Sequence, residues 1–191
     1  ICAREVRESS PHSHLDIGSR VDGLVLQLTH FTNVSIADIR PNHVLQFFGV
    51  ESFMLDACRI RQSETFKSFD SVSAIHSVEH FGLGRYGDRI DPNGFIHFLN
   101  SVHDLINLSG RFYLGFPCGK NEVIFNAHRL LRPSEYIRHL NACMSVQSAF
   151  LLFRGSGCYS VKHVVYDQHA SYAQLDEYEP DAMLLIIQRS M

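Results

Sequence analysis

The densest group of side chains capable of chemistry lies at residues 76–80, which read His-Ser-Val-Glu-His. This order matches the inverted zinc-hydrolase motif, in which two histidines bind zinc and the glutamate activates a zinc-bound water. That chemistry requires both histidines on one face of a helix. Here the segment directly follows an expected strand and is itself followed by Gly82 and Gly84. We therefore expect no metal site and keep a zinc hydrolase as an alternative.

Three further residues stand just past expected strands. Gly18 ends a short apolar segment, where a glycine lets backbone N–H groups approach a ligand closely. Asp38 ends the next strand, about 20 residues later, the spacing of an acid that accepts hydrogen bonds from ribose hydroxyls. Asp56 follows the third strand. Together they predict a nucleotide-like ligand at the strand ends; the alternative is that all three are turn and capping residues.

Short apolar runs alternate with helical periods along the chain, which predicts βαβ units and a doubly wound α/β sheet of about seven mostly parallel strands. We expect strands at residues 14–18, 34–38, 52–56, 69–75, 111–117, 149–153 and 183–188. The clearest helix is expected at 91–108, with Asp91 as its N-cap, Pro92 at its first position and Gly110 at its end. Shorter helices are expected at 21–30 and 133–141. In such sheets, ligands bind beyond the carboxyl ends of the strands.

The composition excludes several classes of protein. Hydrophobic residues make up 45% of the chain, so we expect a single globular domain over residues 1–191, with 1–12 as an irregular N-terminal edge. The net charge of −3 argues against a polycationic nucleic-acid binder, and no nucleic-acid partner is expected. The chain contains no run of about 18 apolar residues, so no membrane span is predicted. The 5 cysteines form no CxxC pair, which indicates free thiols and a cytoplasmic location.

Five segments carry a family resemblance: LDIGSR, IADIRP, MLDACR, FDSVSAIHSVEH and LSGRFYLGFP. In this order they resemble the class I S-adenosylmethionine-dependent methyltransferase superfamily, over about residues 14–118 and more loosely over the whole chain. Asp16 and Gly18 match its first motif, and Arg20 stands where a second glycine is usual. The run EHFGLGRYGDRIDPNG is similar to a poorly characterised branch linked to cell-surface sugar metabolism.

The resemblance implies a Rossmann-like sheet with an antiparallel late strand and S-adenosyl-L-methionine as the cofactor. It implies a cofactor site made of Asp16, Gly18, Arg20, Asp38, Asp56, His76 and Ser77. Gly18 would pack against the methionine portion, Asp38 would bind the ribose hydroxyls and Asp56 the adenine amino group. His76 or Ser77 would lie beside the sulfonium.

The arginine in the first motif leaves two functions open. Arg20 would either crowd the carboxypropyl end of the cofactor or pair with its carboxylate. In the first case, the chain would be a binding protein with a methyltransferase fold and no turnover. In the second, it would be a methyltransferase.

The segment 79–91 is expected to bind the methyl acceptor, because its glycines allow tight turns around a ligand. Methyl transfer needs alignment, and a base when the acceptor is a hydroxyl. His80, or Glu79 alone or with it, is the candidate base; alternatively, Glu79 caps a turn and His80 packs on Tyr86. The expected acceptor-binding residues are Arg85, Tyr86, Asp88, Asn126, His128 and Arg129. We thus expect a small polar or sugar-type acceptor, and the sequence leaves the oligomeric state open.

Overall fold

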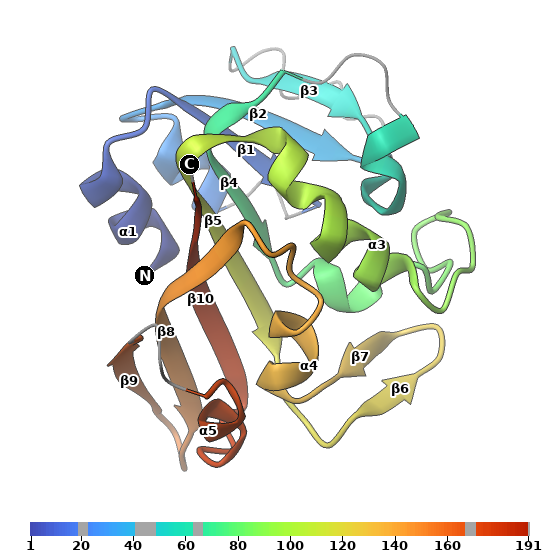
Figure 1. The fold of residues 1–191 in the computed structure, drawn as a ribbon, viewed down its shortest axis with the longest axis vertical. Helices are drawn as coiled ribbons and strands as arrows, with labels where there is room; N and C mark the ends of the chain where they lie inside the picture. The colour runs from blue at the N-terminus through green and yellow to red at the C-terminus, as the bar shows by residue number, and fades with distance from the viewer. Residues whose placement is uncertain (19–22, 41–48, 63–66, 167–170, 191) are drawn as a thin grey trace.

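The computed structural model describes residues 1–18, 23–40, 49–62, 67–166 and 171–190 (Figure 1). Within these ranges, eight strands form the main sheet in the order β3-β2-β1-β4-β5-β10-β8-β9. They are β1 (Ser13–Ile17), β2 (Asn33–Asp38), β3 (Glu51–Met54), β4 (Phe69–Ile75), β5 (Ile106–Pro117), β8 (Met144–Arg154), β9 (Tyr159–Val165) and β10 (Ala182–Arg189). This is the expected doubly wound α/β sheet, with one strand more than expected.

The sheet is parallel in one half and antiparallel in the other. β3, β2, β1, β4 and β5 run parallel, so their carboxyl ends meet at one edge. β10 runs antiparallel between β5 and β8, with Leu185 opposite Leu114 on one side and Ala149 on the other. The antiparallel late strand that the resemblance implies is therefore confirmed.

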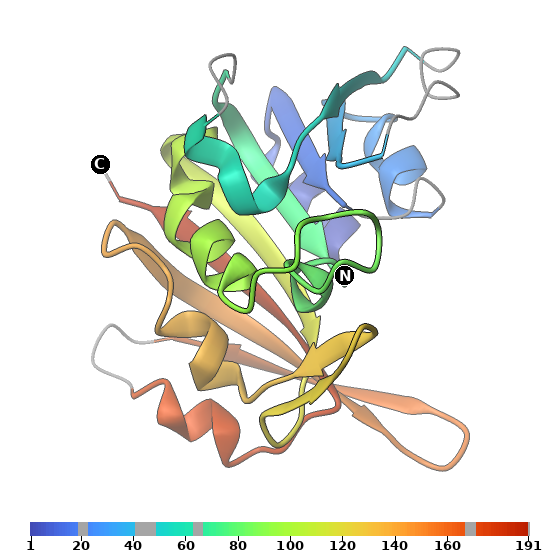
Figure 2. The same cartoon turned by 90° about the vertical axis from the view of Figure 1, so that its right-hand side faces the viewer.

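Helices cover both faces of the sheet (Figure 2). On one face, α1 (Cys2–Ser9) and α2 (Leu24–Leu28) bury Val6 and Leu28 in a cluster with Tyr113 and Phe150. On the other face, α3 (Gly94–Ser101), α4 (Pro133–Ile137) and α5 (Ala173–Asp176) pack on a larger apolar cluster. Burial on both faces explains why the central strands read as nearly continuous apolar runs.

The long helix expected at 91–108 is shorter than predicted. α3 ends at Ser101, a 3₁₀ turn covers Val102–Leu105, and β5 begins at Ile106. The N-cap is Asn93, because Asp91 instead accepts a hydrogen bond from the N–H of Asn93 in a turn before the helix. The apolar side chains that follow Ser101 are buried in the 3₁₀ turn and in β5. Their pattern therefore extended the predicted helix beyond the end of α3.

The residue expected to end that helix lies inside a strand. Gly110 belongs to β5, where a Cβ atom would come within 2.8 Å of the Asp70 carbonyl oxygen. The glycine is therefore needed for the close approach of β5 to β4, where the register of the pair shifts. It has no role as a helix terminator.

Five of the described helices and strands were not expected from the sequence. Residues 2–9, expected to be irregular, form α1, while β9 and α5 add to the C-terminal part. β6 (Glu122–Ile124) and β7 (His128–Leu130) form a separate antiparallel hairpin. In the described part of the chain, no helix has the length and apolar character needed to cross a membrane.

Candidate functional site

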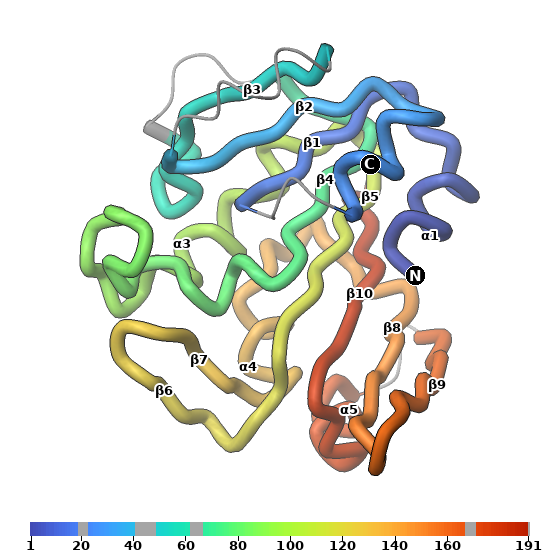
Figure 3. Tube along the Cα trace, turned by 180° about the vertical axis from the view of Figure 1, so that it is seen from behind, coloured from blue at the N-terminus to red at the C-terminus, as the bar shows by residue number. Residues whose placement is uncertain are grey.

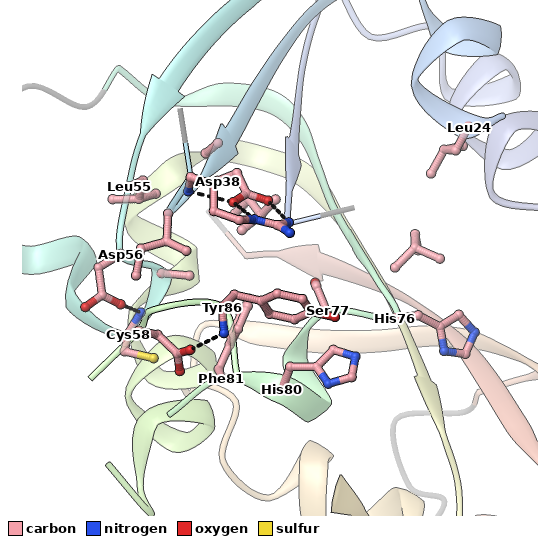
Figure 4. Close-up of a pocket in the computed structure, with 18 residues that line it drawn as sticks. Leu24, Asp38, Leu55, Asp56, Cys58, His76, Ser77, His80, Phe81 and Tyr86 are labelled. Carbon is pink, nitrogen blue, oxygen red and sulfur yellow. Dashed lines mark hydrogen bonds and ion pairs between the residues drawn. The ribbon is translucent and has the colours of Figure 1, made fainter. Parts of the chain in front are cut away.

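A cavity of about 590 Å³ lies beyond the carboxyl ends of the parallel strands (Figure 4). It is bounded by Gly18 after β1, Asp38 at the end of β2, Asp56 after β3 and His76 after β4. The sequence-predicted residues that line it are Gly18, Asp38, Asp56, His76, Ser77, His80, Tyr86 and Asp88. This position agrees with the general rule for ligand sites in open α/β sheets.

Gly18 lies at the cavity where the turn after β1 comes close to β2 and to the turn after β4. Its φ is +69°, and a Cβ atom there would lie 3.0 Å from the Cβ of Ser77. Its N–H donates to the Ala37 carbonyl at 2.8 Å, which ties the turn after β1 to β2. A side chain would therefore strain the backbone and press on Ser77.

Asp38 is paired with an arginine that the sequence analysis did not single out. Arg40 donates from Nε to Oδ1 at 2.9 Å and from Nη2 to Oδ2 at 2.8 Å, and its backbone N–H donates to Oδ1 at 2.8 Å. The guanidinium carbon also lies 4.5 Å from the centre of the Tyr86 ring. Each carboxylate oxygen has two lone pairs, so these three donors fill Oδ1 and leave one acceptor position on Oδ2. The segment IADIRP already contained Arg40, but nothing local indicated that it turns back onto Asp38.

Asp56 and Cys58 form the wall of the cavity near β3. The Asp56 carboxylate accepts a hydrogen bond from the Cys58 N–H at 3.0 Å. Burial, with a smaller effect of the Asp56 charge, raises the pKa of Cys58 to about 12. The thiol is thus protonated at neutral pH and acts as an apolar wall rather than as a nucleophile.

Asp88 lines the cavity but its oxygens serve the loop itself. They accept hydrogen bonds from the N–H groups of Gly82 at 2.8 Å, Gly84 at 3.1 Å and Tyr86 at 3.2 Å. Three amides on one carboxylate fold the loop around Asp88 and hold Tyr86 beside the cavity. This geometry gives Asp88 a role in holding the loop, and its expected contact with the acceptor stays a prediction.

Buried polar atoms occur in the turn after β4. His76 has a φ of +52°, and a 3₁₀ turn of three residues follows at Val78–His80. Ser77 Oγ and Glu79 Oε2 are buried and have no hydrogen-bond partner among the described residues. Glu79 Oε1 lies 3.4 Å from His76 Nδ1 and 3.8 Å from His80 Nε2. Buried polar groups without partners are rare in proteins and call for an explanation at each site.

The zinc-hydrolase alternative requires a geometry that this turn lacks. His76 and His80 are separated by the end of β4 and a short 3₁₀ turn, so no α-helix presents them on one face. Within the described ranges, no three His, Cys, Asp or Glu side chains are grouped to hold a metal ion.

His80 has a defined tautomer. Its Nδ1 lies 2.6 Å from the Ala127 carbonyl oxygen, which can only accept, so Nδ1 carries the proton and Nε2 is the free acceptor. The ring also contacts Tyr86 edge to face, with 5.4 Å between the centroids. Both interpretations from the sequence therefore agree with the geometry: the imidazole packs on Tyr86 and presents a basic nitrogen.

The remaining predicted residues lie outside the cavity lining. Arg129 is buried and donates to the carbonyl oxygens of Phe81 at 2.6 Å and Pro92 at 3.2 Å, so it supports the loop from behind. Burial lowers the pKa of its guanidinium. Arg85 is exposed and donates to Ala127 at 3.1 Å. Asp16, Glu79, Asn126 and His128 are also absent from the described lining, and Arg20 lies outside the described residues.

Asp16 belongs to a buried chain of hydrogen bonds between β1 and β4. Ser73 donates to Asp16 Oδ1 and also lies 2.9 Å from His14 Nε2, while His14 Nδ1 lies 2.6 Å from Ser71 Oγ. Because Ser73 gives its proton to the carboxylate, it accepts from His14, which in turn accepts from Ser71. The network fixes the strand pair directly below Gly18.

Comparisons with known proteins give a family match to part of the chain. Residues 52–138 match the family model described as Caenorhabditis protein of unknown function, DUF268. No curated protein matches the chain.

Solved structures resemble the chain along nearly its whole length. NodS, an N-methyltransferase from Bradyrhizobium japonicum, has a TM-score of 0.65 and 11% identity, with 100% of this chain and 95% of that chain covered. The 1,6-didemethyltoxoflavin-N1-methyltransferase of Burkholderia thailandensis, solved with S-adenosylhomocysteine, has a TM-score of 0.63 and 13% identity, covering 98% and 75%. A TehB-like SAM-dependent methyltransferase from Corynebacterium glutamicum has a TM-score of 0.62 and 15% identity, with 99% of this chain and 86% of that chain covered. The chain therefore has the class I methyltransferase fold.

Proposed function

We propose that the protein binds S-adenosylmethionine and transfers its methyl group to a small polar or sugar-type acceptor. The observation that carries the proposal is the meeting of Gly18, Asp38 and Asp56, from three successive strand ends, in one cavity of about 590 Å³. A glycine turn and two acids in this order suit the methionine, ribose and adenine parts of such a cofactor. The class I fold and the S-adenosylhomocysteine bound in the Burkholderia thailandensis neighbour support the same ligand.

The cavity offers each part of the cofactor a suitable group. Asp38 keeps one lone pair, on Oδ2, for a ribose hydroxyl, and Asp56 would accept from the adenine amino group. Apolar contacts for the adenine ring would come from Leu55, Ala57 and Phe81. Ser77 Oγ, buried at the cavity without a partner among the described residues, would bond to the methionine portion beside Gly18.

His80 would act as the general base. When bound, the cofactor supplies a methyl group on a positively charged sulfur. His80 Nε2 would accept the proton of an acceptor hydroxyl as its oxygen bonds to that methyl carbon and the carbon–sulfur bond breaks, with neutral S-adenosylhomocysteine as the leaving group. The resulting imidazolium would be stabilised by Glu79, whose Oε1 is 3.8 Å away. The Ala127 carbonyl keeps the ring in the orientation and tautomer that this role needs.

Calorimetric titration with S-adenosylmethionine and S-adenosylhomocysteine tests the cofactor assignment. We expect Asp38→Ala to weaken binding at least about tenfold, because hydrogen bonds to a charged group contribute roughly 1.5–3 kcal/mol. Asp104→Ala is the matched control, since Asp104 pairs with Arg61 at 3.0 Å outside the cavity lining. Equal affinity of wild type and a folded Asp38→Ala variant would show that Asp38 is only a turn residue.

A binding protein without turnover is the second candidate. It is favoured by Arg40, which engages both oxygens of Asp38. In that case, the wild type would bind S-adenosylhomocysteine weakly and Arg40→Ala would bind it more tightly. Formation of S-adenosylhomocysteine from S-adenosylmethionine by the wild type would exclude this candidate.

A further inference from the structure

The tip of the β6–β7 hairpin exposes three consecutive large apolar residues. Val123 is 54% exposed, Ile124 47% and Phe125 68%. Neighbouring strand residues point to opposite faces, so both faces of the tip are apolar. A run of three exposed apolar side chains is unusual on a solvated surface unless it binds something.

The hairpin is attached to the candidate catalytic turn by direct hydrogen bonds. The Ala127 carbonyl accepts from His80 Nδ1 at 2.6 Å and from Arg85 Nη1 at 3.1 Å. From β7, Arg129 donates to the carbonyl oxygens of Phe81 and Pro92, at the two ends of the neighbouring loop. Figure 3 shows the hairpin beside this loop, at the end of the sheet where β4 and β5 finish. The tip therefore has a fixed position relative to His80.

The apolar tip is close enough to His80 for one small molecule to contact both. Phe125 precedes Ala127 by two residues, so their Cα atoms are at most about 7–8 Å apart. The Ala127 carbonyl is itself in contact with the His80 ring. A ligand with a polar group at His80 needs an apolar extension of only about 10 Å to reach Phe125.

We infer that the acceptor is amphipathic, with a hydroxylated part at His80 and a hydrocarbon part lying on Val123, Ile124 and Phe125. The inference rests on the proposed function, because it assigns the second half of the same acceptor. Its polar half matches the expected polar or sugar-type acceptor, and its apolar half follows from the hairpin.

Two other occupants fit the surface less well. An anionic bilayer is attracted by clusters of Lys and Arg, whereas the residues leading into the tip carry opposite charges on Lys120 and Glu122. A stable protein interface buries about 800 Å² on each partner, far more than three side chains provide. A hydrocarbon chain or ring on a small molecule matches the size of the patch.

The experiment compares two neutral probes with the same head group. Octyl β-D-glucoside, kept below its critical micelle concentration, carries a hydrocarbon tail, and methyl β-D-glucoside does not. In calorimetric titrations of the full chain, we expect the octyl probe to bind more tightly, by up to about fourfold for each methylene that is buried. Val123→Ser and Phe125→Ser should each weaken octyl binding about fivefold or more, without changing the affinity for S-adenosylhomocysteine.

Val161→Ser on β9 is the matched control, since Val161 is 49% exposed and lies on an edge strand of the main sheet and not on the hairpin. Equal affinity of the two probes, or equal loss in Val161→Ser, would overturn the inference. So would binding to phosphatidylcholine vesicles without binding of the monomeric probe, or a dimer that Val123→Ser dissociates. S-adenosylhomocysteine reports on the cavity and the octyl tail on the hairpin, so failure of the proposed function is distinguishable from failure of this inference.

Discussion

Two polar clusters, one between β1 and β4 and one in the turn after β4, differ in whether their buried polar atoms are hydrogen-bonded. The first, which we term the closed cluster, consists of His14, Ser71, Ser73 and Asp16. All four side chains are buried, and the chain of hydrogen bonds from Ser71 through His14 and Ser73 ends on the Asp16 carboxylate. The closed cluster joins β1 to β4 in the middle of the sheet.

The second, which we term the open cluster, consists of His76, Ser77, Glu79 and His80. Two of its buried atoms, Ser77 Oγ and Glu79 Oε2, have no hydrogen-bond partner in the described part of the chain. His76 also has a left-handed backbone conformation, which costs free energy in a residue with a side chain. Its two histidines and its serine line the cavity.

The difference indicates which polar residues serve the fold and which are available to a ligand. A buried polar group destabilises a protein unless it is hydrogen-bonded. The closed cluster meets this requirement internally and contributes to stability. The open cluster retains both unmet hydrogen-bonding capacity and local strain, which are typical of functional sites.

The largest effect is expected at the open cluster's imidazole. His80→Gln keeps a donor for the Ala127 carbonyl but has no basic nitrogen, so S-adenosylhomocysteine formation should slow by about 10²–10⁴. Affinity for S-adenosylhomocysteine should stay within about twofold, because the base touches the acceptor. His97→Gln, on α3 beside Asp91, is the control. Undiminished turnover in His80→Gln would remove His80 from the mechanism.

Replacing each of the two buried serines by alanine should change the free energy of unfolding by different amounts. Ser73→Ala removes the hydrogen bonds that Ser73 makes to His14 Nε2 and to Asp16 Oδ1, and we expect the free energy of unfolding to fall by about 2–3 kcal/mol. Ser77→Ala removes a hydroxyl that has no hydrogen-bond partner among the described residues, so its effect should stay within about 0.5 kcal/mol. Urea unfolding of both variants measures the difference. Equal losses in the free energy of unfolding would mean that the Ser77 hydroxyl is hydrogen-bonded in solution and that the open cluster has no unmet hydrogen-bonding capacity at this residue.

The two buried acids provide a second pair. Asp16→Asn weakens the hydrogen bond from Ser73, and we expect a loss of about 1.5 kcal/mol in the free energy of unfolding. Glu79→Gln replaces a buried carboxylate whose Oε2 has no hydrogen-bond partner within the described ranges, and should leave stability unchanged or raise it. Thermal and urea unfolding test the pair. A larger loss for Glu79→Gln than for Asp16→Asn would reverse the assignment of the two clusters.

The smallest effect is the pH dependence contributed by His14. Burial lowers the pKa of His14 from 6.5 to about 3. Between these values the unfolded chain binds a proton that the folded chain does not, so stability is fully present above pH 6.5 and lost as the pH falls. Between pH 6.5 and 5.5 the free energy of unfolding should fall by about 1 kcal/mol, because the unfolded imidazole is half protonated at the first pH and mostly protonated at the second.

Unfolding by urea at pH 6.5 and 5.5 measures this decrease, with His14→Gln as the variant that should not show it. NMR titration of the imidazole provides a check that does not depend on the variant. A His14 ring that titrates near pH 6.5 in the folded protein would show that the closed cluster is accessible to water.

The sequence by itself determined the sheet and the strand-end residues. Alternating apolar runs and helical periods are local signals, so all seven expected strands are present and the α/β fold is confirmed. The positions of Gly18, Asp38 and Asp56 follow from the same signals, because parallel strands must bring their carboxyl ends to one edge. The roles assigned to these residues remain predictions.

The tertiary structure decided which side chains meet. The end of α3 at Ser101, the β6–β7 hairpin and the attachment of that hairpin to His80 depend on contacts between residues far apart in the sequence. Arg129 was expected to contact the acceptor and instead supports the loop from behind, because its burial and its carbonyl partners exist only once the chain has folded. Local pattern predicts where the backbone runs, whereas hydrogen-bond partners depend on distances that only packing determines.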